Sequence, residues 1–443
     1  MIKTEDVVNR KLNKRDIMEQ IIPWLSERES IIIVGSRQVG KSCLMFLLAQ
    51  YLLKTKIANL ENIAFFDLES SADLEICNSG VSALLEHLRL AGKKFHSKRI
   101  LYLFIDEIQY LDNPSQLVKL LVDHHPEIKI IASGSSSTGL RKKFKDTLPG
   151  RKQEFHLQSL AFKEFLNFRQ EHQLSELTEK FCLRNIFGKR MPEPPAIQPF
   201  LQRLIPLFEE YTVYGGHPAV VMADSADIKQ KRLQSIINDY LRKDIHTLFD
   251  IDHLGSFTQL IKILAGQIGS LTVYSELTTP LGITYRTLQR YLDILSVTFV
   301  VDLIPPYFSN VKKRVIKSPK TYFYDTGIRN ALINQFLPLS DRIDKGHLVE
   351  NVIFQLLAGL QDIANPVSFW RTYSGTEIDF LIRDMAIEVK YQPLKSAKVP
   401  RAMKSGMSQI NAKNTLVVTK DFLDSRQLND TQALFIPACL LSR

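Results

Sequence analysis

The chain has 443 residues, and one hydrophobic core rarely grows that large, so its length predicts about three domains of ordinary size. Its composition, 45% hydrophobic and 23% charged, is typical of globular proteins and argues against long disordered tails. The net charge of +10 and the pI near 9.2 permit a polyanionic partner such as DNA without requiring one.

The sequence shows no signal for a membrane span, for export or for disulfide bonding. No apolar run approaches the ~18 residues of a membrane span, and the first residues lack the apolar core of a signal peptide. We therefore expect a cytoplasmic protein with no membrane partner. The four cysteines lie far apart without any Cys-x-x-Cys, which predicts reduced structural thiols rather than a zinc site or a disulfide framework.

Short apolar runs separated by helix-length segments mark the first third of the chain. They lie at residues 31–34, 63–68, 100–105 and 128–132. Such runs are typical of buried parallel strands, and their alternation with helices predicts a doubly wound α/β sheet. The ligand of such a sheet binds beyond the carboxyl ends of its strands.

The remaining chain divides by pattern into three further segments. A helical region follows the sheet, and we expect the proline-marked stretch at residues 192–195 to be an exposed connection. Residues 271–304 then give helix, turn, helix and strand, the outline of a winged helix-turn-helix. Strand-like runs near the C-terminus predict a second α/β domain. The expected domains are 1–165 for the P-loop sheet, 166–250 for a helical lid, 251–329 for the winged helix and 330–443 for the C-terminal domain.

A phosphate-binding loop follows the first apolar run and precedes a helix. Its sequence fits G-x-x-x-x-G-K-[ST] in the context which that motif requires. We expect ATP to contact Gly35, Ser36, Arg37, Gln38, Val39, Gly40, Lys41, Ser42 and Cys43. Backbone N–H groups of such a loop surround the phosphates, Lys41 reaches the β- and γ-phosphates, and Ser42 binds Mg²⁺.

Two adjacent acids, Asp106 and Glu107, end the apolar run at 100–105. After a P-loop, this pattern is typical of a Walker B strand. We expect Asp106 to hold the Mg²⁺ shell and Glu107 to orient or deprotonate the attacking water.

Two further polar positions have two interpretations each. Ser135 lies in the hydroxyl cluster after the fourth apolar run, where it either senses the γ-phosphate or caps a helix. Arg151 follows Pro149 and Gly150, where it is either a surface arginine or an arginine finger that reaches the nucleotide of a neighbouring subunit. The second interpretation of Arg151 predicts a homo-oligomer, such as a ring.

These motifs together resemble a widespread prokaryotic family of AAA-type ATP-binding proteins with a C-terminal domain of unknown function. Two more segments look like marks of that family, Tyr-Gly-Gly-His-Pro at 214–218 and Tyr-Phe-Tyr-Asp-Thr-Gly at 322–327. The resemblance covers nearly the whole chain. It implies a lid in which Gly216 and Pro218 pack near the nucleotide, whereas from the residues alone Gly-Gly-x-Pro is only a turn.

The C-terminal part of that family is similar to the restriction-endonuclease fold, and this chain has matching residues. The resemblance implies that Glu350, Asp379 and Glu388 bind Mg²⁺ or Mn²⁺. Lys390, on the same strand face as Glu388, would help to position water for phosphodiester hydrolysis. No Pro-Asp pair precedes the Glu-x-Lys, because Asp379 follows Ile378. Alternating acids and lysines are also common on solvated strand faces, and a fold can outlast its chemistry.

The interpretation that joins these signals is a Mg²⁺-dependent ATPase acting on DNA, in which the nucleotide state controls the winged-helix and nuclease-like regions. Arg286, Gln289 and Arg290 on the second winged-helix helix would contact DNA, or they are only a solvated face. The alternative is a nucleotide-controlled protein-interaction switch with a catalytically inert C-terminal domain.

Overall fold

The computed structural model describes two compact units. The described residues are 10–96, 99–134, 149–184, 186, 194–246, 249, 251, 254–307, 318–362, 364–372, 374–406, 410, 412–428 and 431–443. The first unit comprises Met1–Gln158, Lys243–Asp250 and Val297–Phe299, and the second comprises Ser159–Arg242, Ile251–Ser296 and Val300–Arg443.

A parallel sheet of five strands forms the centre of the first unit. Its order is β2-β3-β4-β1-β5. The strands are β1 (Ser30–Val34), β2 (Ile63–Asp67), β3 (Leu101–Asp106), β4 (Ile128–Gly134) and β5 (Lys152–His156). Every neighbouring pair is parallel, so all five carboxyl ends lie at one edge. This confirms the predicted parallel sheet of a P-loop fold.

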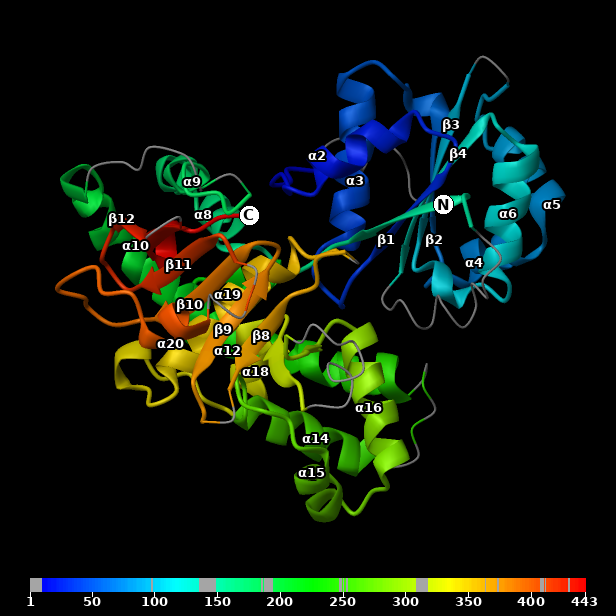
Figure 1. Cartoon of the computed structure of the whole chain (residues 1–443). Coiled ribbons are helices and arrows are strands. Elements are labelled where there is room, and N and C mark those ends of the chain that lie inside the picture. The colour runs from blue at the N-terminus through cyan, green and yellow to red at the C-terminus, as the bar shows by residue number, and fades with distance from the viewer. Residues whose placement is uncertain are drawn as a thin grey trace. The chain divides into compact units, whose positions relative to one another are not determined.

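Helices cover both faces of this sheet (Figure 1). One face carries α2 (Met18–Ile21) and α3 (Lys41–Lys54), and the other carries α4 (Ser71–Asn78), α5 (Val81–Leu90) and α6 (Pro114–His124). Because side chains alternate along a strand, Ile31 and Ile33 of β1 pack with α3, whereas Ile32 and Val34 pack with the core under α5 and α6. Both faces of each central strand are therefore buried.

The second unit begins with a group of helices. They are α8 (Phe162–Phe168), α9 (His172–Glu179), α10 (Pro194–Tyr214), α11 (Pro218–Val221) and α12 (Ala226–Asp239). The π-helix η4 (Tyr240–His246) follows α12 and belongs to the second unit as far as Arg242 and to the first from Lys243 onward. The expected connection at 192–195 is instead where α10 starts, at Pro194. A proline is tolerated in a first helical turn because its missing N–H would have no intrahelical partner there.

Three helices and a two-stranded sheet follow. They are α14 (Leu254–Gly266), α15 (Tyr274–Leu281), α16 (Tyr285–Val297), β6 (Val301–Ile304) and β7 (Lys320–Phe323), and β6 and β7 pair antiparallel. Gly282, with φ 62°, ends α15 in the left-handed conformation that suits glycine. The order of these elements is the one expected for a winged helix-turn-helix, and that assignment stays a prediction.

A mixed sheet of six strands forms the C-terminal part of the second unit. Its order is β12-β13-β11-β10-β9-β8. The strands are β8 (Ser368–Arg371), β9 (Glu377–Ile382), β10 (Met385–Lys390), β11 (Asn414–Thr419), β12 (Asp424–Leu428) and β13 (Thr431–Pro437), with helices α18 (Thr326–Leu332), α19 (Lys345–Ala358) and α20 (Arg401–Gly406). Strand β11 pairs parallel with both of its neighbours, β10 and β13, and the other pairs in this sheet are antiparallel. This confirms a second, mixed α/β domain. None of the described helices is long and apolar enough to cross a membrane, and all four cysteines have free thiols.

The two glycine-containing segments at 214–218 and 322–327 pack against each other inside the second unit. The Gly216 N–H donates to Asp325 Oδ2 at 2.9 Å, and its carbonyl accepts from the Leu160 N–H at 2.8 Å. A Cβ on Gly215 would lie 2.1 Å from Asp325 Oδ1, and one on Gly327 would lie 2.0 Å from the Tyr214 carbonyl oxygen. Only glycine permits backbones to approach this closely.

A buried charge network holds α18 to the start of α19. Arg329 is 2% exposed, and its guanidinium donates to Asp344 Oδ2 at 2.7 Å. Arg342 donates to both oxygens of the same carboxylate, at 2.8 Å each. Burial alone would raise the pKa of Asp344, but the hydrogen bonds from Arg342 and Arg329 lower it to about 2.

We expect Asp344→Asn to destabilise the fold in a pH-dependent way. A carboxylate whose pKa is lower in the folded state stabilises that state above its unfolded pKa of ~3.9 and loses this contribution as the pH falls toward the folded pKa. The substitution should therefore lower the free energy of unfolding by about 2 kcal/mol or more at pH 7. Urea unfolding of both proteins between pH 7 and pH 3 measures the difference, which should shrink with falling pH. A constant difference would contradict the assigned charge network.

Candidate functional site

The loop between β1 and α3 has the backbone geometry of a phosphate-binding loop. Gln38 and Gly40 have φ angles of 59° and 98°, and α3 begins directly after Gly40. A Cβ on Gly35 would lie 2.2 Å from the carbonyl oxygen of Leu157, so the loop can leave β1 here only with glycine. Val39 is buried, whereas Gln38 and Cys43 are exposed. The N-terminus of α3, with its positive end of the helix dipole, is thereby held at the carboxyl edge of the sheet.

The Lys41 side chain is buried within this loop. Its ammonium nitrogen donates to the carbonyl oxygens of Gly35 at 3.2 Å and Ser36 at 3.1 Å, and it lies 3.9 Å from Glu107 Oε1. A buried ammonium group needs anionic or carbonyl partners. Lys41 is thus fixed at the point where the P-loop motif requires a positive charge.

Asp106, the last residue of β3, is hydrogen-bonded to two hydroxyl groups. The Ser133 hydroxyl, from β4, donates to Asp106 Oδ1, and the Ser42 hydroxyl from α3 is a second hydrogen-bond partner. Burial raises the pKa of Asp106, although both hydroxyls act in the opposite direction. An oxygen-rich pair formed by Ser42 and Asp106 matches the ligands that Mg²⁺ prefers.

Glu107 follows Asp106 in a left-handed conformation, with φ 55°. Its N–H donates to Ser133 Oγ at 3.1 Å, and its carboxylate accepts from the Gln109 amide. These contacts turn the carboxylate toward Lys41. The structure therefore places Lys41, Ser42, Asp106 and Glu107 together.

Two supporting residues were not predicted from the sequence. The Ser133 hydroxyl lies beside Asp106, whereas Ser135 lies outside the described residues, so its expected role stays a prediction. A signal for Ser133 was available, because it belongs to the hydroxyl cluster that ends the fourth apolar run. Arg15 is 5% exposed and donates to the carbonyls of Val39 and Gln158, at 2.8 Å each. No local sequence pattern marks Arg15, because it lies far before the loop in the sequence and belongs to no motif.

Arg151 lies at the opposite edge of the sheet from the phosphate-binding loop. It precedes β5, whose first residue Lys152 pairs with Ser30, the first residue of β1. Its guanidinium donates to Asp123 Oδ1 at 2.7 Å, and its side chain is 32% exposed. Within one chain, this position is remote from Lys41. A role at a nucleotide would therefore involve another subunit, and that role stays a prediction.

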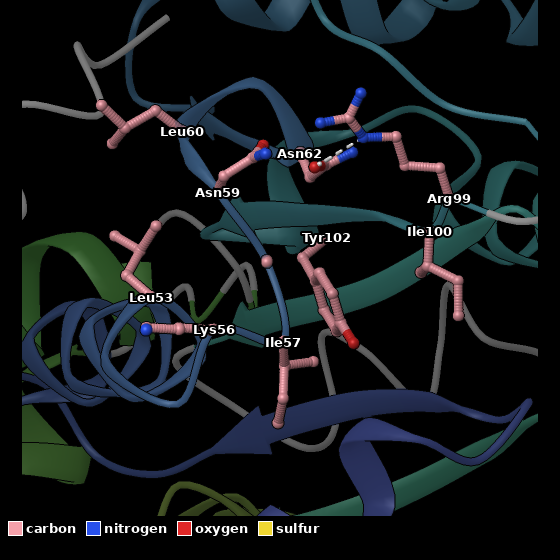
Figure 2. A pocket seen from close by; sticks show the side chains of 10 residues that line it. Leu53, Lys56, Ile57, Asn59, Leu60, Asn62, Arg99, Ile100 and Tyr102 are labelled. Carbon is pink, nitrogen blue, oxygen red and sulfur yellow. Dashed lines mark hydrogen bonds between the residues drawn. The ribbon is translucent and has the colours of Figure 1, made fainter.

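A cavity of about 640 Å³ lies at the amino ends of β2 and β3, and Figure 2 shows side chains that line it. Leu53, Ile57, Leu60 and Ile100 contribute apolar walls, and Arg99 donates to Asn62 Oδ1 at 3.1 Å. None of its lining residues belongs to the phosphate-binding loop. The cavity is therefore separate from the nucleotide site.

The second unit brings the predicted C-terminal acids into one cluster. Asp379 of β9 accepts the Val389 N–H at 2.7 Å, and Lys390 Nζ lies 2.6 Å from Glu388 Oε1 on β10. Burial raises the pKa of Asp379 well above its ordinary value, and the nearby carboxylates of Glu350 and Glu388 raise it further. Glu388 is 4% exposed, and its Oε2 atom has no hydrogen-bond partner among the described residues. A buried carboxylate oxygen without a partner is costly and is suited to a cation.

Glu350, on α19, is occupied by other partners. Its carboxylate accepts from Lys320 at 3.2 Å, from the Tyr322 hydroxyl, and lies 3.3 Å from His347 Nδ1. The described residues contain no group of three or more His, Cys, Asp or Glu side chains already arranged to hold a metal. Glu350 is therefore bonded to Lys320 and Tyr322 and does not join Asp379 and Glu388 in one set of metal ligands. Sequence analysis did not assign Lys320 and Tyr322 to this site.

The remaining predicted site residues lie elsewhere in the second unit. Gly216 is buried between Leu160 and Asp325, and Pro218 starts α11. Their expected position near a nucleotide stays a prediction. Arg286, Gln289 and Arg290 are all exposed on α16.

Family models match three parts of the chain. Residues 27–166 match a model described as AAA domain, which covers the parallel sheet and the phosphate-binding loop. This part of the chain is an AAA-type P-loop domain. Residues 205–338 and 345–439 match two further models, each described as a domain of unknown function (DUF8612 and DUF4143).

Relatives similar to the whole chain are uncharacterized. A Haemophilus influenzae protein is 24% identical over 97% of this chain and 98% of its own length. A Methanocaldococcus jannaschii protein is 25% identical over 84% of this chain and 75% of its own. Both are named only as uncharacterized proteins, so they add no activity to the AAA-type assignment.

Solved structures give only distant likenesses. The Aeropyrum pernix ORC1 protein in complex with DNA is 12% identical, with a TM-score of 0.32, over 75% of this chain and 96% of that one. The S. cerevisiae Hsp104–ADP complex is 16% identical, with a TM-score of 0.33, over 67% of this chain and 41% of that one. At these values, nothing about the ligands of this chain follows from them.

Proposed function

We propose that this protein is a Mg²⁺-dependent ATPase. The observation that carries the proposal is the meeting of Lys41, Ser42, Asp106 and Glu107 at the carboxyl edge of the parallel sheet. The loop before α3 provides backbone N–H groups for the phosphates, and Lys41 provides the positive charge for the β- and γ-phosphates.

The residues present fit a magnesium ion. Ser42 and Asp106 are hydrogen-bonded to each other and offer the hard oxygen ligands that Mg²⁺ requires. When bound, Mg²⁺ would neutralise charge on the phosphate oxygens during transfer. Glu107 orients the attacking water and accepts its proton. Ser133 holds both acids in place, because its hydroxyl accepts from the Glu107 N–H and donates to the Asp106 carboxylate.

The P-loop roles predict different defects for two variants. Lys41→Ala should weaken ATP binding by roughly tenfold or more, because a charge-assisted contact with the phosphates is lost. Glu107→Gln should bind ATP normally and slow hydrolysis by roughly a hundredfold or more, because a general base is removed. Isothermal titration and phosphate release measure the two effects. Unchanged affinity in Lys41→Ala would refute the P-loop assignment.

We propose that Arg151 acts as an arginine finger on a neighbouring subunit of a homo-oligomer. Its exposed guanidinium lies at the edge of the sheet opposite Lys41, so only a second chain could bring the two together. An arginine finger stabilises the charge that develops in phosphoryl transfer.

Arg151→Ala should bind ATP normally and hydrolyse it slower by roughly a thousandfold. Mixing it with the Lys41→Ala protein should restore part of the turnover, because one mixed interface then holds an intact loop and an intact arginine. Lys152→Ala, which changes the neighbouring basic residue, is the matched control. Specific activity that stays constant down to the most dilute monomeric sample would exclude a shared site.

For the second unit, we propose a nuclease-like role on DNA under control of the nucleotide state. Asp379 and Glu388 would hold a Mg²⁺ or Mn²⁺ ion beside Lys390, and the unpartnered Glu388 Oε2 supports a cation there. The basic net charge and the exposed basic residues of α16 favour a polyanion. The competing proposal is a nucleotide-controlled protein-interaction switch with an inert C-terminal domain.

Mn²⁺ should raise the thermal midpoint of the full chain without nucleotide, through selective binding to the folded state. Asp379→Asn and Glu388→Gln should each abolish this rise, whereas Asp384→Asn, on the turn between the same strands, should keep it. Lys390→Ala should retain the rise and lose any nicking of plasmid or branched DNA. A wild-type protein with neither a Mn²⁺-dependent rise nor nicking would favour the inert domain.

ATP turnover with and without DNA separates the two proposals for the whole chain. A rate that rises with linear or branched DNA supports an ATPase acting on DNA, while an unchanged, slow rate supports the interaction switch. The Glu107→Gln protein controls for contaminating ATPases.

A further inference from the structure

Lys320 is a buried cation inside the C-terminal acidic cluster. Its side chain is 2% exposed, and its ammonium nitrogen lies 3.2 Å from Glu350 Oε1 and in close contact with Glu377 Oε1. The same nitrogen lies 5.5 Å from the centre of the Phe369 ring. Burying a lysine is unfavourable, but the two carboxylates outweigh this effect and raise the pKa of Lys320.

Glu350 is satisfied by this arrangement without any metal. Besides Lys320, it accepts a hydrogen bond from the Tyr322 hydroxyl and contacts His347. Residues on β7 thus supply a cation and a hydroxyl donor to a carboxylate on α19. Asp379 and Glu388 differ, because Glu388 Oε2 has no hydrogen-bond partner among the described residues. Within the described part of the cluster, Glu388 is therefore the carboxylate that a cation would still stabilise.

The cluster keeps a net negative charge. Four carboxylates, those of Glu350, Glu377, Asp379 and Glu388, share it with the ammonium groups of Lys320 and Lys390 and with the Arg371 guanidinium, which lies 3.2 Å from Glu377 Oε2. With all four carboxylates charged and His347 neutral, one negative charge remains, so the cluster can accept a divalent cation. Without Lys320 two would remain, and the buried Glu350 would lose its ammonium partner, which is strongly unfavourable.

We propose that Lys320 is a built-in cation of the acidic cluster, which fills the place between Glu350 and Glu377 that a second divalent ion would otherwise take. The Asp379 and Glu388 pair then binds one divalent ion. Lys320 does not bind the metal itself. By neutralising part of the charge of these carboxylates, it determines how many divalent ions the cluster binds and how tightly. The statement about Asp379 and Glu388 rests on the proposed function, whereas the statement about Lys320 does not.

The test counts Mn²⁺ ions bound per full-length chain in the absence of nucleotide, by isothermal titration. Lys320→Met should bind one more Mn²⁺ than the wild-type protein, because Glu350 and Glu377 lose the ammonium group that contacts both of them. Lys320→Arg keeps the charge and should bind the wild-type number. An unchanged number in Lys320→Met would overturn the proposal. No Mn²⁺ in the wild type and one in Lys320→Met would support the built-in cation while refuting the metal site at Asp379 and Glu388.

The double variant Lys320→Met with Glu350→Gln keeps the test decisive if Lys320→Met fails to fold. It removes one charge of each sign, so it should fold and bind the wild-type number of Mn²⁺ ions. Folding is measured as the thermal midpoint with and without Mn²⁺. Recovery of the Lys320→Met fold by Mn²⁺ would support the proposal. If the double variant instead bound one ion fewer than the wild type, Glu350 would be a metal ligand, and this result would overturn the proposal.

Discussion

A carboxylate at the end of a doubly buried strand is the constraint on which the first unit depends. The side chains of β3 are buried on both faces up to Ile105, so the first acid that follows has to lie at the edge of the sheet. Burial raises the pKa of Asp106, and the hydroxyls of Ser42 and Ser133 offset part of this effect. Those two serines come from two different elements, α3 and β4. The packing of the sheet thereby decides which groups meet.

The acidic cluster of the second unit obeys the same physics with a different result. Asp379 and Glu388 lie within the adjacent strands β9 and β10, where burial raises the pKa of both carboxyl groups. Lysines offset negative charge there, because Lys320 contacts Glu350 and Glu377 and Lys390 contacts Glu388. One oxygen of Glu388 still has no hydrogen-bond partner among the described residues. A buried polar atom without a partner is unfavourable for folding, so the stability of the fold does not explain this cluster.

Local sequence patterns predicted the elements well, because periodicity and strand ends are local properties. The apolar run expected at 63–68 overlaps β2, and the run at 128–132 lies within β4. The contacts between elements were not predictable in the same way. The hydrogen bond from Ser133 to Asp106 depends on the register of β4 against β3, and Arg15 reaches Gln158 across most of the first unit's sequence. Strand β8 pairs beside β9 with a register shift that no sequence pattern shows.

The two glycine-containing segments at 214–218 and 322–327 illustrate why a sequence motif need not indicate a ligand-binding site. Gly215, Gly216 and Gly327 each sit where a Cβ would collide with Asp325 or with a carbonyl oxygen. Close packing is therefore a sufficient physical reason for these glycines. The segment that contains Asp325 starts from β7, the strand whose first residue is Lys320. One continuous stretch thus fixes the glycine turn through Asp325 and supplies the cation to Glu350 through Lys320. Lys320 and Asp325 are both buried, so this short stretch of chain contributes both to the close packing at the glycine turn and to the charge balance of the acidic cluster.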